Sequence, residues 1–379
     1  MTRISPQTSI NPRAHMFGKR PSVLSGTLLL SVVLFTQSVP QWLTPARAAE
    51  DPDRLWIRYP SIAPNGKQIA FSFRGDLWTV SRDGGSARPL SSHLGYESMP
   101  VWSPDSKQIA FASDRHGNLD VFVMDAAGGP SRRLTFHSTD DRPTAFTPDG
   151  ARVLFVSRRQ DAPQATIPHP VMSELYSVST QADRPRQLIT TPAERARFSP
   201  NGKQLIYQDF KGFEDYWRKH HSSSVTRDIW LWNPKSGKHR KLTQFSGEDR
   251  DPVWAPDGKT VYYLSEASGS FNVWKLNPQK PKQAPVQVTQ HKPHPVRFLS
   301  ISDARVLAYG YNGELWTKAI DADPTQVKFS VVAVSLKNQV EQVTLREGAT
   351  EFAVAANEAE IAVIVRGELF VSSVQHSTT

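Results

Sequence analysis

The chain has 379 residues, of which 38% are hydrophobic and 21% are charged, and it contains no cysteine. This balance is typical of a globular protein and excludes an intrinsically disordered chain. The lack of cysteine excludes a disulfide framework and any thiolate metal site.

Residues 1–48 predict a secretory signal peptide. Arg13, Lys19 and Arg20 precede the apolar run Val23–Phe35, and the segment ends in the small-residue sequence Ala46–Ala48. A basic start, a short apolar run and a small-residue cleavage site are the parts of such a peptide. The run is shorter than the ~20 residues that a membrane-spanning helix needs, which makes a permanent anchor the weaker alternative. We therefore expect export, to the periplasm in a Gram-negative cell, with no membrane attachment after cleavage.

The signal segment also accounts for much of the formal charge of +9. It holds five of the 45 Lys and Arg residues and none of the 36 acidic residues, so the rest of the chain carries only +4. Nucleic-acid binding requires a clustered basic face rather than a mild excess. We expect no nucleic-acid partner.

One phrase of sequence recurs along the chain. In "VWSPDSKQIAFASDRHGNLDVFVMDAAGGPSRRLT" (Val101–Thr135), four short apolar segments are separated by three turns. Alternating segments joined by Pro, Asp and Gly turns predict an antiparallel meander. The first turn of the unit recurs at Pro64–Gly66, Pro104–Ser106, Pro148–Gly150, Pro200–Gly202 and Pro256–Gly258. Asn, Asp and Gly tolerate the left-handed backbone that such a turn requires.

Units of about 40–50 residues with four strands each predict an all-β fold, a six-bladed β-propeller of four-stranded antiparallel blades. The sixth unit, His294–Ile320, is degenerate, with Ser302–Ala304 in place of the turn. We expect the propeller over residues 49–335. Residues 336–379 are expected to be a linker and the first blade of a truncated second propeller, and Lys328–Gly348 to finish the last blade before that link.

Several conspicuous residues are interpreted as structural. Trp78, Trp230, Trp274 and Trp316 share the third-strand position, where an aromatic ring packs between blades. The basic pairs Arg132–Arg133 and Arg240–Lys241 lie on outer strands, where charge discourages edge pairing.

Motifs for chemistry are absent or fail on spacing. The sequence contains no Gly-x-Ser-x-Gly elbow, so no catalytic serine of the α/β-hydrolase type is predicted. A proline between His291 and His294 prevents the one-face helical geometry of a zinc motif. We predict no catalytic residues, no metal site and no cofactor.

The most distinctive insertion is "DFKGFEDYWRKHHSSSVTRDIWLW" (Asp209–Trp232), between the second and third strands of the fourth unit. It carries His220, His221 and Arg227. A decorated loop on a rigid scaffold is a common place for function, although a solvated packing loop has the same composition. A second long connection, Arg158–Glu174, is proline-rich and is expected to be a rigid covering loop.

The repeats "SPDGK", "DLW" and "RRLT" are similar to TolB-type propeller repeats. The insertion, together with "FSGEDRDPVWAPDGKTVYYLSE" (Phe245–Glu266) and "HPVRFLSIS" (His294–Ser302), resembles the amino-terminal six-bladed propeller of secreted tricorn-type serine peptidases. The resemblance runs from about Tyr59 to the end of the chain. Members of that family continue into a second propeller, a PDZ domain and a catalytic domain, so the resemblance implies a fragment without the catalytic elements.

The resemblance also implies a role with peptides. In the family, this propeller is associated with guiding peptides, and a basic pair before the third blade with holding the terminal carboxylate of the substrate. The corresponding loop here, Phe136–Pro143, is shorter and carries only Arg142. Arg227 matches a family arginine. The candidate peptide-binding residues are therefore Arg142, Arg227, His220 and His221.

Three functions remain open. The first is a non-catalytic propeller that scaffolds and channels peptides or unfolded polypeptide for peptidase domains outside this chain. The second is a free-standing TolB-like module that binds a periplasmic protein partner. The third is the propeller of a prolyl oligopeptidase-type enzyme, which would require a following α/β-hydrolase domain.

Overall fold

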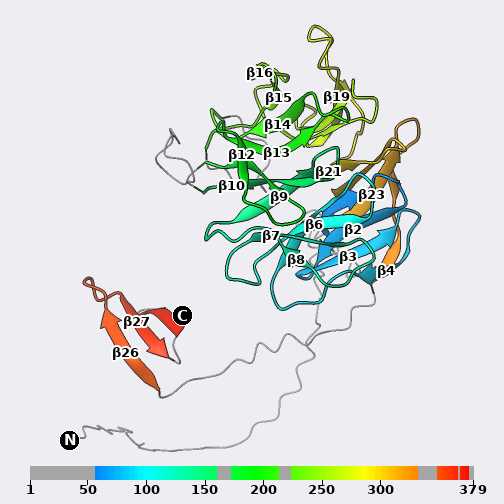
Figure 1. Cartoon of the computed structure of the whole chain (residues 1–379). Helices are drawn as coiled ribbons and strands as arrows, with labels where there is room; N and C mark the ends of the chain where they lie inside the picture. The colour runs from blue at the N-terminus through cyan, green and yellow to red at the C-terminus, as the bar shows by residue number, and fades with distance from the viewer. Residues whose placement is uncertain (1–55, 160–171, 213–222, 332–347, 366–367, 375–379) are drawn as a thin grey trace, which may run out of the picture. The chain divides into compact units, whose positions relative to one another are not determined.

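The computed structural model describes residues 56–159, 172–212, 223–331, 348–365 and 368–374 (Figure 1). The chain divides into two units, residues 1–52 and 53–379. The first unit, which contains the predicted signal peptide, lies outside the described residues. Within the described part of the chain, no helix is long and apolar enough to cross a membrane.

The described residues form 28 β-strands. In chain order they are β1 (Arg58–Ile62), β2 (Gln68–Phe73), β3 (Asp76–Ser81), β4 (Gly85–Pro89), β5 (Glu97–Trp102), β6 (Gln108–Ser113), β7 (Asp120–Asp125), β8 (Arg132–Arg133), β9 (Asp141–Phe146), β10 (Arg152–Ser157), β11 (Glu174–Ser179), β12 (Arg186–Ile189), β13 (Ala193–Phe198), β14 (Leu205–Asp209), β15 (Ile229–Asn233), β16 (Lys238–Lys241), β17 (Asp249–Trp254), β18 (Val261–Ser265), β19 (Asn272–Leu276), β20 (Val286–Gln287), β21 (Val296–Ile301), β22 (Val306–Tyr311), β23 (Glu314–Ala319), β24 (Thr325–Gln326), β25 (Phe329–Val331), β26 (Ala349–Val354), β27 (Glu360–Val365) and β28 (Glu368–Ser373).

The strands β1 to β24 build six sheets of four consecutive antiparallel strands, which are the six blades of a β-propeller (Figure 1). The first strand of each blade is innermost and contacts the first strands of the two neighbouring blades, all the way around the ring. The second strands are buried on both faces, as in Gln108–Ser113 and Arg152–Ser157. A blade whose two faces are both apolar can only bury them between two neighbours, so stacking around an axis follows from the sequence pattern.

The predicted first turn of each blade is present with the expected backbone. Gly66, Gly150, Gly202 and Gly258 have φ between +62° and +72°, and Ser106 has φ +62°. In the degenerate sixth unit the turn lies at Asp303–Arg305, one residue later than the predicted Ser302–Ala304. Arg305 has φ +59°, and its amide donates a hydrogen bond to the carbonyl oxygen of Ser302. The fold therefore keeps the left-handed turn even where the sequence offers an arginine.

The strand β25 closes the ring, although the sequence pattern predicts this strand in the wrong blade. Lys328–Gly348 was expected to finish the last blade, but the last blade ends at β24, and β25 pairs with β4 of the first blade instead. The pairing is parallel, with Phe329 opposite Gly85, and it makes the first blade five-stranded. At the seam between the first and last blades, the backbone amide of Asp303 also donates a hydrogen bond to the carbonyl oxygen of Pro64, at 2.8 Å.

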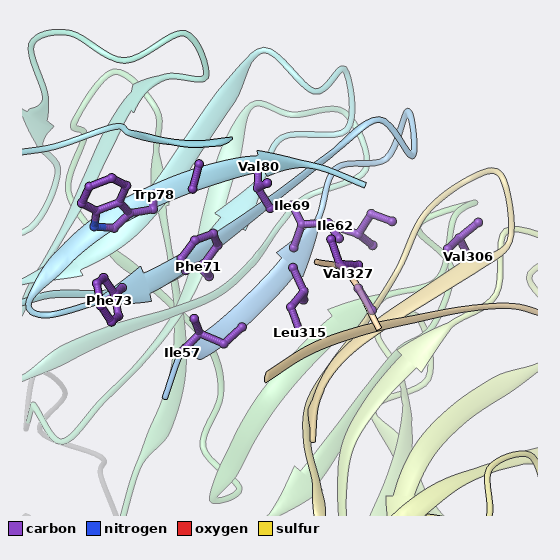
Figure 2. Close-up of a cluster of buried hydrophobic side chains, with 12 residues drawn as sticks. Ile57, Ile62, Ile69, Phe71, Phe73, Trp78, Val80, Val306, Leu315 and Val327 are labelled. Carbon is purple, nitrogen blue, oxygen red and sulfur yellow. The ribbon is translucent and has the colours of Figure 1, made fainter. Parts of the chain in front are cut away.

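An apolar cluster fills this seam (Figure 2). Ile62, Ile69 and Phe71 from the first blade pack with Leu315 from the last blade and with Val327, which precedes the closing strand. Phe329 joins the cluster, with its ring 5.2 Å from that of Phe71. Burial of apolar area is worth roughly 25 cal/mol per Å², so this shared core stabilises ring closure together with the backbone pairing of β25 and β4.

The third-strand tryptophans pack as predicted. Trp78 is buried, and Trp230, Trp274 and Trp316 are partly buried against the cores between blades. Arg132–Arg133 and Lys238–Lys241 form outer strands, as their charge indicates.

The strands β26 to β28 form a separate three-stranded antiparallel sheet. Its side chains are largely exposed, including Phe352 and Leu369. Its assignment to the first blade of a second propeller, and the boundaries 49–335 and 336–379, remain predictions.

Candidate functional site

The six innermost strands surround a channel on the axis of the ring, and equivalent residues from each blade line it. One part of this channel is a hollow of about 320 Å³, which we call the first hollow. In each blade, the residue three positions before the turn proline lines it; in the sixth blade, Asp303 takes the place of the proline. These residues form one ring, which we call the axial ring: Ser61, Val101, Ala145, Arg197, Val253 and Ser300.

The wall of the first hollow is mixed, with polar groups of Ser61, Arg197, Ser300 and Ser302 beside apolar side chains. The residue after each axial-ring member also lines it: Ile62, Trp102, Phe146, Phe198, Trp254 and Ile301. The turn prolines and Asp303 form its rim. Concave sites of this volume that combine apolar side chains with a few polar groups are those in which proteins bind small molecules.

A second hollow lies further along the axis and is much smaller, at about 30 Å³. Tyr59 and Phe298 narrow it with rings 4.6 Å apart. Arg195 and Asp251 also line it and form an ion pair, with Nε 3.2 Å from Oδ1. The channel is therefore wide on the side of the turn prolines and nearly closed on the other side.

The narrow part of the channel holds strained backbone. Each innermost strand shifts register near this point, as a β-bulge does, and five of the residues at the shifts have φ between 48° and 61°: Tyr59, Met99, Arg195, Asp251 and Phe298. Non-glycine residues in this region are costly and concentrate at functional sites, which marks the channel as the candidate site.

Arg197 is the one charged member of the axial ring, and it lines both hollows. No hydrogen bond or ion pair of its guanidinium occurs within the described residues, because the nearby carboxylate of Asp251 is paired with Arg195. Burial, and repulsion from Arg195 to a smaller extent, lower the pKa of Arg197 to about 10. The side chain remains a cation at neutral pH with its charge incompletely compensated.

A buried polar network connects this channel with the end of the fourth-blade insertion. Arg227, predicted as a peptide-binding residue, is buried, and its Nη1 lies 2.9 Å from Oε1 of Glu248. Its Nε lies 3.5 Å from Oε2 of Glu194, which accepts a hydrogen bond from Gln208 at 3.0 Å. Gln208 connects this network to the channel wall, because its side-chain oxygen accepts a hydrogen bond from the backbone amide of Asp251, at 2.9 Å.

The charge of Arg227 is compensated inside this network. Glu248 also accepts from Nε of Arg250, at 2.6 Å, and both partners are buried. Although burial raises the pKa of Glu248, the guanidinium groups of Arg250 and Arg227 outweigh it and hold the pKa below its usual value. Arg227 thus links the fourth and fifth blades from a buried position, and its role in peptide binding remains a prediction.

Arg142, the second predicted peptide-binding arginine, lies elsewhere. It is the second residue of β9 rather than part of the preceding loop, and its Nη2 lies 2.7 Å from Oδ2 of Asp140. The pair is about one-third exposed, which leaves the guanidinium accessible. The structure does not bring Arg142 together with Arg227.

His220 and His221 lie outside the described residues, as do the central parts of both predicted loop insertions. Among the described residues, no group of three or more His, Cys, Asp or Glu side chains could hold a metal ion.

Sequence reasoning missed Arg195, Arg197 and Asp251. The signal was available in the aligned units, because the position three residues before each turn carries a small or apolar residue in five blades and an arginine in the fourth. A charged residue at a position where the other five blades carry small or apolar residues is not explained by packing, and such exceptions are expected at functional sites.

Residues 54–324 match the family described as the tricorn protease N-terminal β-propeller domain. The crystal structure of the tricorn protease is similar, with a TM-score of 0.61 and 20% identity; the match covers 85% of this chain and 30% of that chain.

Curated relatives match over shorter stretches. The protein TolB homolog of Chlorobium luteolum is 38% identical over 69 residues, which is 17% of this chain and 16% of the homolog. The Tol-Pal system protein TolB of Nitratidesulfovibrio vulgaris is 36% identical over 56 residues, or 14% of this chain and 13% of that protein. The chain therefore matches less than a third of the length of each of these proteins.

Proposed function

Because the chain belongs to the tricorn protease N-terminal β-propeller domain family, we propose that it is the non-catalytic propeller of a tricorn-like peptidase and binds peptides for that enzyme. The family match supports the placement in a peptidase. The axial hollow, with Arg197 at its base, supports peptide binding, since a concave wall of mixed polarity with one cation suits the carboxylate end of a chain.

The mode that fits this channel is holding rather than free passage. Tyr59, Phe298 and the pair Arg195–Asp251 narrow one end to a hollow of about 30 Å³, which is too small for an extended polypeptide. A peptide that entered from the wide side would stop at Arg197. In this proposal, the propeller scaffolds the substrate and a proteolytic domain outside these residues cuts it.

We place this activity in the periplasm. The predicted signal peptide over residues 1–48 and the partial matches to TolB proteins support that location. Fractionation of cells that express the full chain tests it: the mature protein should appear in the periplasmic fraction, starting near Ala49 by amino-terminal sequencing. Full-length protein retained in the cytoplasm would contradict it.

The experiment for the proposed function measures binding and hydrolysis with the same purified chain. Fluorescein-labelled peptides should bind, as read by fluorescence anisotropy, and should remain intact after long incubation. Hydrolysis that a serine-reactive probe abolishes would overturn the non-catalytic assignment. A chain that binds none of a diverse peptide set would overturn the peptide role.

The partial TolB matches favour a second candidate, a free-standing module that binds a periplasmic protein. The two proposals differ in the size of the natural product. An antibody raised against the propeller should detect a polypeptide much larger than 42.4 kDa if the propeller belongs to a peptidase. A product of about the size of this chain would favour the free-standing module.

A further inference from the structure

Packing around the axis does not explain one residue of the axial ring, Arg197. Five of its six positions carry Ser, Val or Ala, which fill the limited space near the axis, whereas the fourth blade contributes Arg197. A cation at such a position costs desolvation energy, and a cation inside a protein is normally paired or hydrogen-bonded. The nearby carboxylate of Asp251 attracts Arg197, but it forms its ion pair with Arg195, at 3.2 Å.

We infer that the first hollow is a binding site for a small organic monocarboxylate, whose carboxylate pairs with Arg197 and whose apolar body packs in the hollow. The guanidinium fork matches the two oxygens of a carboxylate, and such pairs are the strong, orienting kind. The aromatic part of the wall, which includes Trp102, Phe146 and Phe198, suits a hydrocarbon or ring beside the carboxylate.

The negative charge of Asp303 at the rim of the hollow favours a ligand with only one carboxylate. Asp303 stands where the other five blades have the turn proline, and it is the one acidic residue among those that line the hollow in the described structure. A ligand whose carboxylate lies at Arg197 directs its other end toward this rim. A second negative charge there would be repelled by Asp303, so a dicarboxylate is disfavoured.

Two sources can supply this chemistry: a free organic acid, or the carboxyl terminus of a short peptide. The inference does not depend on the proposed peptidase role, because the free acid requires no peptidase. Lowering of the pKa of Arg197 to about 10 is consistent with the inference, since the group stays protonated at neutral pH and gains from an anion beside it.

Isothermal titration of the full mature chain with 4-phenylbutyrate tests the inference, with 4-phenylbutyramide as the neutral control. The acid should bind, and the amide should bind at least tenfold more weakly, as expected for loss of a charge-assisted bond. Suberate, a dicarboxylate, should also bind more weakly than the monocarboxylate. Equal binding of acid and amide, equal binding of suberate, or no binding of the acid at millimolar concentration would overturn the inference.

Variants locate the site. Arg197→Ser, which introduces the residue that the first and sixth blades have at this position, should fold and should weaken binding of the acid roughly tenfold to hundredfold. Arg197→Lys keeps the charge and should retain part of the affinity. Arg186→Ser, at a guanidinium that is 73% exposed on an outer strand, is the control for loss of one positive charge and should change nothing. Unchanged binding in Arg197→Ser would place the ligand elsewhere.

The source of the carboxylate is resolved by a second arm. N-acetyl-Leu-Phe as the acid and as the amide is titrated beside phenylbutyrate. Tighter binding of the peptide acid identifies a peptide terminus as the preferred ligand, and tighter binding of phenylbutyrate identifies a free organic acid; both require that Arg197→Ser removes the preference for acid over amide. If that preference persists in Arg197→Ser, the assignment to Arg197 is wrong.

Discussion

The backbone amide of Gly85 donates a hydrogen bond to the carbonyl oxygen of Lys328, at 3.1 Å, and this bond joins the two ends of the propeller ring. Gly84, at φ +92°, lets the chain approach so closely that a Cβ at this position would collide with the same oxygen. The parallel pairing of β25 with β4 begins at this contact. The closure of the ring therefore depends on the absence of a side chain at one residue.

We predict that Gly84→Ala lowers the free energy of unfolding by about 3 kcal/mol, from backbone strain and loss of the closing hydrogen bonds. Gly85→Ala is the matched control, because Gly85 also has a positive φ but a Cβ there would meet nothing within 4 Å. Gly85→Ala should lower the free energy of unfolding only by the backbone strain, about 1–2 kcal/mol. Urea denaturation followed by circular dichroism measures both variants. Equal losses would mean that β25 contributes little to ring closure.

A second prediction concerns the degenerate turn of the sixth blade. Arg305 is exposed and has φ +59° at a position where four other blades carry glycine. Arg305→Gly should raise the free energy of unfolding by about 0.5–1 kcal/mol, because relief of the left-handed strain exceeds the added entropy of the unfolded chain. The neighbouring substitution Ala304→Gly is the control and should lower stability by a similar amount. A loss of stability in Arg305→Gly would show that the turn is not strained.

The blades, their turns and their aromatic packing could be predicted from the sequence because they depend on local patterns. Alternating apolar residues, turn prolines and glycines fix each meander without reference to the rest of the chain. The degenerate turn of the sixth unit was predicted one residue too early, at Ser302–Ala304, because no proline or glycine marks it; the left-handed residue is Arg305. The closing strand could not be placed, because Phe329–Val331 is only three residues long and its partner lies in the first blade.

The candidate site was less accessible to sequence reasoning. Arg227 stands out in the sequence within a decorated insertion, and its functional interpretation rested on that position. Its partners Glu194 and Glu248 come from two different blades, so only the three-dimensional arrangement shows that its charge is satisfied. Arg197 was overlooked for the opposite reason: its local sequence is ordinary, and its meaning appears only when the six units are superposed around one axis.

The two predicted arginines should behave differently when each is replaced. Arg227→Met should lower the free energy of unfolding by about 1.5–3 kcal/mol, because it removes charge-assisted contacts to Glu248 and Glu194, although Glu248 keeps its pair with Arg250. Arg142→Met removes a partly exposed pair with Asp140 and should change stability by less than about 1 kcal/mol. Denaturation curves of both variants give the comparison, and peptide binding by Arg142→Met tests its predicted role separately. A small effect of Arg227→Met would contradict the buried network.

The last prediction concerns pH and the carboxyl group of Asp249. This residue begins β17 and is fully buried, and burial is the main reason that its pKa is raised to about 7. The nearby carboxylates of Asp228 and Glu248 raise it further, while the hydroxyl groups of Ser265 and Thr243 act in the opposite direction. The folded protein therefore prefers the protonated carboxyl group, whereas the unfolded chain ionises near pH 3.8.

The sign of the effect follows from this difference. Unfolding releases a proton from Asp249 between about pH 4 and pH 7, so its contribution to stability is full at lower pH and is lost as the pH rises through 7. Asp249→Asn has the same shape and cannot ionise, so it should be more stable than the natural protein at pH 8, on the order of 3 kcal/mol, with the difference shrinking toward pH 4. Urea midpoints at pH 5, 6, 7 and 8 measure this difference, with the exposed Asp83→Asn as control. Parallel pH profiles for Asp249→Asn and the natural protein would show that Asp249 is ionised in the fold and that the network compensates its charge.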